Sequence, residues 1–95
     1  MSAGTLPIAK FRLGRIVATP NVLQSITEQD ILIAIQRHQA GDWGELESTD
    51  RKANDRALAD NTRILSAYNS GNGIRFWIIT EADRSITTVL LPQDY

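Results

Sequence analysis

Hydrophobic residues concentrate in three short runs of the last third of the chain: TRILSAY (62–68), GIRFWIIT (73–80) and SITTVLLP (85–92). Runs of this kind, rich in β-branched and aromatic residues, are typical of strands. NSGNG (69–73) separates the first two runs and favours a hairpin, because Asn and Gly tolerate a positive φ. EADRS (81–85) is a short polar connection between the second and third runs, so the three strands are expected to pair antiparallel.

The first two thirds of the chain carry one strand signal followed by helical spacing. FRLGRIVATP (11–20) predicts a strand that stops at Thr19-Pro20. Three helices are then predicted: one capped by Thr19, one that opens at Thr27 and is ended by Gly41, and one from about Thr49 to Asp60 with Ser48 or Thr49 as its cap. In the third helix we expect Ala53, Ala57 and Leu58 to face inward, and Arg51, Lys52, Asn54, Asp55 and Arg56 to face solvent.

These elements define the fold class. The order β-α-α-α-β-β-β predicts an α+β protein with an antiparallel sheet of three to four strands and the helices packed on one face. We expect residues 1–10 to form a flexible arm and residues 11–95 a single domain, since 95 residues suffice for one core but not for two.

The central strand is apolar on both of its faces. Ile74, Phe76, Ile78 and Thr80 point one way, and Arg75, Trp77, Ile79 and Glu81 point the other. The apolar residues of the second set need a cover, which the arm, the C-terminal tail or another chain could supply. If another chain covers them, it could be a second copy of this one, in a homodimer. The predicted partner-binding residues are therefore Trp43, Arg75, Trp77, Ile79, Glu81 and Arg84.

Composition narrows the classes of function. The chain has no cysteine, no apolar run near the roughly 18 residues of a membrane helix and no secretory signal, so we expect a cytoplasmic protein without membrane contact. The net charge is −1, and the acids concentrate in residues 27–60. A nucleic-acid binder usually carries a clear basic excess, so a protein partner, in particular a basic one, is favoured.

Each candidate functional residue allows a functional and a structural interpretation. His38, the only histidine, could be a general base, or a residue at a helix end that is favoured there when protonated. Arg84 could hold a phosphate while His38 or Glu81 transfers a proton, or EADRS could be only a turn. Trp43, inside GDWG (41–44), could be a binding anchor or a plug between helix and sheet. No cofactor and no metal are predicted, since His38 has no companion ligand.

Three stretches carry a resemblance: GDWGELESTDRKANDRAL (41–58), RILSAY (63–68) and FWIITEADRSITTVLLPQDY (76–95). In them the chain, from about Leu13 to Tyr95, resembles a group of small bacterial proteins borne on plasmids, prophages and integrative elements, some of them linked to restriction systems. The resemblance implies a mobile-element context and no particular activity. The order of helices and then strands is also similar to that of barnase/RelE-type ribonuclease toxins, in topology alone.

Two hypotheses follow. The first is a small non-enzymatic interaction protein, a mobile-element accessory factor that binds a host or element protein. One version of it is an inhibitor of a defence nuclease, in which an acidic surface made of Glu45, Glu47, Asp50, Asp55 and Asp60 mimics nucleic acid. The alternative is an RNA-binding or RNA-cleaving domain that works through His38, Glu81 and Arg84.

Overall fold

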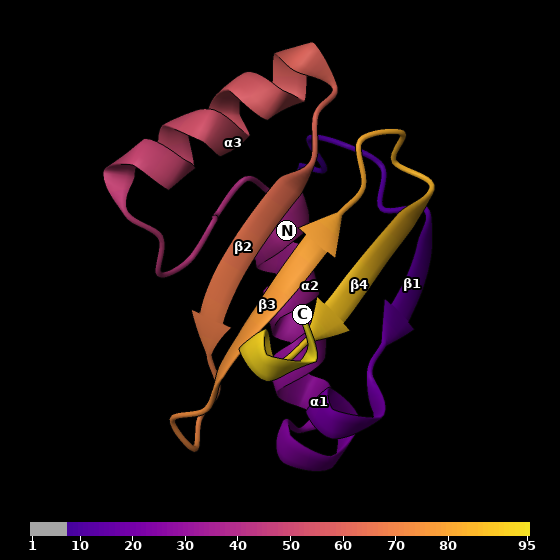
Figure 1. The fold of residues 1–95 in the computed structure, drawn as a ribbon, viewed down its shortest axis with the longest axis vertical. Coiled ribbons are helices and arrows are strands. Elements are labelled where there is room, and N and C mark those ends of the chain that lie inside the picture. Colours follow the sequence, from indigo (N-terminus) through magenta and orange to yellow (C-terminus); the bar gives the residue numbers. More distant parts are fainter. Residues whose placement is uncertain (1–7) are drawn as a thin grey trace, which may run out of the picture.

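The computed structural model describes residues 8–95 (Figure 1). Its elements in chain order are β1 (Arg15–Ala18), α1 (Pro20–Ser25), α2 (Glu28–Gln39), α3 (Ser48–Asp60), β2 (Ile64–Asn69), β3 (Arg75–Thr80), β4 (Ile86–Leu90) and the 3-10 helix η1 (Pro92–Asp94). The α+β class and the order β-α-α-α-β-β-β are as predicted. Residues 1–7 of the predicted arm lie outside the described residues, whereas Lys10 already donates its backbone N–H to the Gln39 carbonyl at 2.8 Å.

The sheet has four strands in the order β1-β4-β3-β2. The pairs β2–β3 and β3–β4 are antiparallel, as the short connections predicted, but β1 pairs with β4 in parallel. The parallel pair makes the sheet mixed where an antiparallel one was expected. Its cause is the long excursion of the chain through three helices between β1 and β2, which returns β4 beside β1 in the same direction.

Two of the three predicted helix caps form as expected. The hydroxyl oxygens of Thr19 and Thr27 each accept a backbone N–H of the first helical turn, from Val22 and Asp30 at 3.2 Å, and so begin α1 and α2. The third helix begins without such a bond, since its N-cap is Glu47 and not Ser48 or Thr49.

Helices α1 and α2 cover one face of the sheet, behind the strands in Figure 1. The main core lies between these helices and the sheet. It is formed by Val22, Ile26, Ile31, Ala34, Ile35, Tyr68, Phe76, Ile78, Val89 and Leu91. We call the opposite side of the sheet, toward the viewer in Figure 1, the second face. It carries Trp77 and Ile79 of β3, which register with Leu90 and Thr88 of β4.

Helix α3 lies along the outer edge of β2 and not on the helix face with the other two (Figure 1). Its orientation differs from the prediction at two residues. Ala53 is exposed, while Asn54, expected to face solvent, is buried. The Asn54 amide donates to the Leu65 carbonyl at 2.7 Å and accepts the Leu65 N–H at 3.3 Å, so it pairs with the strand edge as a neighbouring strand would. A binary pattern of apolar and polar residues does not reveal a polar side chain used in this way.

Candidate functional site

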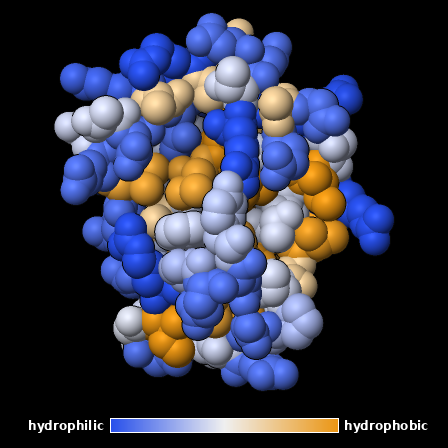
Figure 2. All heavy atoms as spheres, viewed as in Figure 1, coloured by the Kyte–Doolittle hydropathy of each residue, from blue (hydrophilic) through white to orange (hydrophobic). Residues whose placement is uncertain are grey.

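An open groove of about 330 Å³ lies between α3 and the second face. Its lining residues are Leu46, Asp50, Ala53, Asn54, Leu65, Arg75 and Trp77, and we call it the α3 groove. It exists because Asn54 ties α3 to the edge of β2, so that the N-terminal half of the helix stands beside the second face without packing flat on it. Figure 2, viewed onto this face, shows hydrophobic residues gathered beneath α3 and hydrophilic residues along the helix itself.

Two predicted partner-binding residues line the α3 groove. Trp77 is half-buried, with part of its indole accessible, and Arg75 is exposed. The Arg75 guanidinium donates to the Glu45 carbonyl at 3.0 Å, which holds its charge near the loop before α3. Aromatic side chains with accessible faces beside a charged group are frequent energetic centres of protein interfaces. The prediction missed Leu46 and Leu65, because the groove joins segments that are distant in the sequence.

Most acidic residues of the middle segment lie on α3 and in the loop before it. Asp50 lines the α3 groove, and Glu45, Glu47, Asp55 and Asp60 are exposed. Of the bases in the same segment, Arg51 is exposed, and its guanidinium donates to the carbonyls of Gly44 at 2.8 Å and Leu46 at 2.9 Å. The lining itself holds one acid, Asp50, and one base, Arg75, and Glu45 and Glu47 add two acids in the loop beside it.

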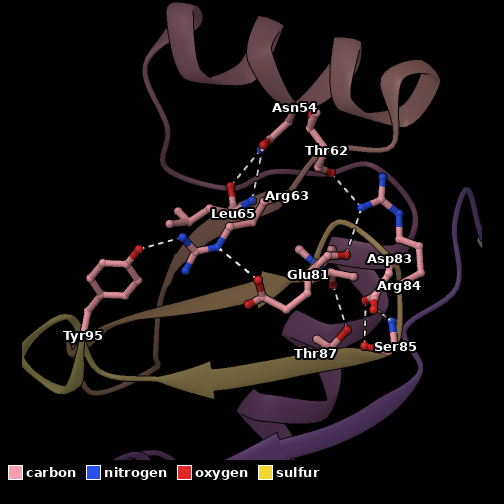
Figure 3. A network of polar contacts seen from close by, with 12 residues as sticks. Asn54, Thr62, Arg63, Leu65, Glu81, Asp83, Arg84, Ser85, Thr87 and Tyr95 are labelled. Atoms are coloured by element: carbon pink, nitrogen blue, oxygen red, sulfur yellow. Dashed lines mark hydrogen bonds and ion pairs between the residues drawn. The ribbon is translucent and has the colours of Figure 1, made fainter.

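The C-terminal tail covers part of the second face. Tyr95 packs edge-on against Trp77, with ring centroids 5.8 Å apart, and Arg63 donates to the Tyr95 hydroxyl at 2.6 Å. Arg63 also lies 3.7 Å from the carboxylate of Glu81, as Figure 3 shows. Ile79 is only 2% exposed beneath this cover. Of the covers considered for the second face, the tail is thus one that forms, and Tyr95 itself remains 69% exposed.

Trp43 is a buried plug. It is 5% exposed, it packs in a second core cluster with Ala57 and Ile64, and its indole N–H donates to the carboxylate of Asp55 at 2.9 Å. The backbone around it pairs with β2 through the carbonyl of Trp43 and the N–H of Glu45, both bonded to Ala67. The structural interpretation of GDWG therefore describes its environment better than the binding-anchor interpretation does.

Arg84 ties the β3–β4 turn to the end of α3. Its guanidinium donates to the carbonyls of Thr62 at 2.7 Å and Glu81 at 3.2 Å (Figure 3). It also donates to the Ala57 carbonyl at 3.0 Å. A cation at a helix C-terminus is favourable both for the unpaired carbonyls and for the helix dipole. The turn itself is closed by Asp83, whose carboxylate accepts the N–H of Ser85 at 3.0 Å and its hydroxyl at 2.6 Å. These donors pull the pKa of Asp83 below its usual value.

Replacing Arg84 with alanine is expected to destabilise the protein by about 2 kcal/mol, because carbonyls of the α3 end and the turn lose a charged donor. Chemical denaturation of R84A and of a control variant, R56A, measures the difference. R56A removes an exposed arginine from α3, the helix whose end Arg84 contacts. We expect R56A to stay within about 0.5 kcal/mol of the wild type. Equal stability of R84A and R56A would contradict this role for Arg84.

His38 lies in a buried chain of hydroxyl groups on the helix face. It is 0% exposed, Nδ1 is 2.6 Å from the Ser66 hydroxyl, and Nε2 is 2.8 Å from the Thr80 hydroxyl. The Thr80 and Thr87 hydroxyls are 2.7 Å apart, and Thr87 donates to the Leu13 carbonyl at 2.7 Å. Because that carbonyl can only accept, Thr80 donates to Thr87 and Nε2–H donates to Thr80, and in a neutral ring Nδ1 then accepts from Ser66.

Burial, assisted by the positive charge of Arg84, lowers the pKa of His38 from 6.5 to about 3, so its imidazole is neutral near pH 7. The expectation of a histidine favoured in its protonated form at a helix end is wrong, because this ring points into the core, away from the solvent that would stabilise the charge.

Of the three residues of the nuclease hypothesis, Arg84 lies near the other two, since it bonds to the Glu81 carbonyl and contacts the same Phe11 ring as His38. The side chains of His38 and Glu81, however, lie on opposite faces of the sheet. Thr80 turns toward the helix face, where it meets His38, so Glu81, the next residue, turns toward the second face. Arg84 is engaged by three carbonyls at the end of α3. Among residues 8–95, no three His, Asp or Glu side chains lie together in a way that could hold a metal ion.

Comparison with protein-family models, with curated proteins and with solved structures finds no match to this chain. None of the helices within residues 8–95 is long and apolar enough to cross a bilayer.

Proposed function

We propose that this chain is a small, non-enzymatic, cytoplasmic interaction protein that binds a basic partner protein at the α3 groove. The observation that carries the proposal is the groove itself, which combines an accessible part of Trp77 with the apolar side chains of Leu46 and Leu65. Buried apolar anchors supply most of the affinity of protein interfaces, and a groove of this size accommodates one or two side chains of a partner.

Charge supports a basic partner. Asp50 lines the groove, and Glu45 and Glu47 stand in the loop beside it, so three acids stand against the two bases Arg75 and Arg51. Complementary charge steers a partner to its site and suppresses like-charged competitors. The floor of the groove binds an aliphatic side chain in this proposal, and the acids bind the lysine or arginine next to it.

The partner does not add a strand at this place. On the outer edge of β2, Asn54 bonds the N–H and carbonyl of Leu65, and the segment 43–45 bonds those of Ala67. A strand added to a sheet needs free backbone groups on its edge, and here they are used. Side chains inserted from a helix or loop of the partner fit the groove instead.

The biological role in this proposal is that of a mobile-element accessory factor, and the resemblance of 41–58, 63–68 and 76–95 to plasmid- and prophage-borne proteins supports it. An inhibitor of a defence nuclease is the version that agrees best with the charge. The exposed carboxylates along α3 would then occupy the phosphate-binding surface of that nuclease, with the groove as the apolar centre of the contact.

The test uses two matched variants and a synthetic peptide pair. Ala53 lines the groove and Ala59 does not, and both are exposed on α3. Ala53→Trp is expected to fill the groove, and Ala59→Trp to leave it open. The probes are peptides that alternate leucine with lysine or leucine with glutamate, titrated while the Trp77 indole N–H resonance is followed.

We expect the lysine peptide to shift the Trp77 resonance in the wild type and in Ala59→Trp, with at least a tenfold weaker effect in Ala53→Trp. The glutamate peptide should leave the resonance unchanged. The proposal would be contradicted if Ala53→Trp bound the lysine peptide as tightly as the wild type does, or if the two peptides bound the wild type equally.

A further inference from the structure

The two edges of the sheet are treated differently by the fold. The β2 edge is closed by Asn54 of α3 and by a bridge between Gly44 and Ala67. The β1 edge has no such cover from the described part of the chain, and Figure 1 shows no element beyond β1 on that side. A bare edge is a template for another strand unless charge, proline or a bulge blocks it.

The backbone of β1 shows which groups are free for such a strand. Arg15 and Thr19 donate their N–H groups inward, to Ser85 at 2.9 Å and Val89 at 3.0 Å in the β4 segment. In a parallel pair alternate residues bond on the same side, so the N–H and C=O groups of Ile16 and Ala18 point away from β4. The edge thus offers two donors and two acceptors.

We propose that a second copy of this chain binds the β1 edge through its own β1, in antiparallel orientation, to form one continuous sheet of eight strands. The free groups fix the register. Ile16 of each copy exchanges two hydrogen bonds with Ala18 of the other, and the two Val17 residues face each other on the two-fold axis as a non-hydrogen-bonded pair. This dimer is independent of the α3 groove, which lies at the opposite edge of the sheet.

Charge favours a second copy over an unrelated strand. In this register Arg15 stands opposite the second copy's Thr19, on the second face of the sheet. Thr19 donates to the carboxylate of Asp94 at 2.6 Å, so each Arg15 faces an acidic group of the other copy. Asn21 and the Leu91 N–H use two more acceptor positions of that carboxylate, which leaves about one of its four for Arg15. An antiparallel pairing of two copies brings the start of each β1 beside the end of the other. Arg15 at the start and Asp94 beside the end therefore attract each other across the two-fold axis.

The helix face of β1 adds an apolar contact. Ile16 is 48% exposed although it belongs to a strand, and the residue opposite it in the dimer is the small Ala18. The strand is only four residues long, so the dimer is expected to be weak and to dissociate on dilution.

A single cysteine tests both the contact and its register. The chain has no native cysteine, and Val17→Cys places two thiols across the two-fold axis at about the 4.5 Å Cα separation of a non-hydrogen-bonded pair. With oxidised glutathione as the oxidant, V17C is expected to form a covalent dimer in proportion to its concentration. The control A59C carries its thiol on the exposed face of α3 and should crosslink at least tenfold less. Equal crosslinking of the two variants would overturn the proposal.

Light scattering on the chain without cysteine is the second measurement. We expect the wild type to be partly dimeric near millimolar concentration, and Arg15→Glu to weaken the dimer at least fivefold, because like charges then meet. Arg12→Glu changes an exposed arginine outside the strand and should leave the dimer constant unchanged. A wild type that stays monomeric throughout this range, or equal effects of the two variants, would also overturn it.

Discussion

Acidification from about pH 6 to about pH 4.5 is expected to lower the free energy of unfolding by about 2 kcal/mol, because of His38 alone. The folded state holds its imidazole neutral, with the pKa lowered from 6.5 to about 3. Between these two values the unfolded state binds the proton and the folded state does not. Stability therefore falls as the pH drops below 6.5, at up to about 1.4 kcal/mol per pH unit, and the loss stops growing below about pH 3.

Burial of the ring, assisted by the positive charge of Arg84, explains why the folded state resists the proton. In the neutral ring Nδ1 accepts from Ser66 and Nε2 donates to Thr80, and a proton on Nδ1 requires the Ser66 hydroxyl to turn its hydrogen away. Chemical denaturation at a series of pH values measures the slope, and nitrogen NMR of the imidazole is expected to show the Nε2–H tautomer.

His38→Gln provides the control for this prediction. Its amide oxygen can accept from Ser66 and its amide nitrogen can donate to Thr80, but it has no proton to gain. The carboxylates whose pKa the fold lowers, those of Asp42, Asp83 and Asp94, start from 3.8 and lose their contribution only below about pH 4. The variant should thus show little pH dependence between about 4.5 and 6. If it keeps the wild-type slope, His38 is not the cause.

Replacing Gly44 with alanine is expected to cost more than 3 kcal/mol, which makes it the most damaging small substitution in the loop that covers β2. Gly44 has φ +75°, and a Cβ placed on it would lie 2.0 Å from the Ala67 carbonyl oxygen and 2.7 Å from the Tyr68 ring. Relief of that contact requires the 43–45 segment to leave the strand edge, so the bond from the Glu45 N–H to Ala67 is lost as well.

Gly73→Ala separates the two costs. Gly73 has a similar φ of +81°, but a Cβ there would have no neighbour within 4 Å. It is expected to cost about 1 kcal/mol, which is the backbone term alone. Denaturation curves of the two variants measure the difference, and equal destabilisation would mean that the close approach at Gly44 is relieved without loss of the pairing.

The sequence was sufficient for the helices, the strands and most of their boundaries. Thr19-Pro20, Thr27 and NSGNG are local signals, and local hydrogen bonds and dihedral preferences act on them in the same way in any fold. The sequence also indicated that Trp77 and Arg75 stand together on a mixed face, because the alternation of side chains along a strand needs no knowledge of its neighbours.

Contacts between distant segments decided what the sequence left open. The burial of His38 depends on Ser66 and Thr80, 28 and 42 residues away, and the orientation of Asn54 depends on the edge of β2. The sequence does not distinguish the burial of the two tryptophans, yet Trp43 is enclosed in a core cluster and Trp77 lines the groove. A polar residue is buried only where partners for all its hydrogen bonds converge, and an edge is open only where no other segment arrives, so both are properties of the assembled chain.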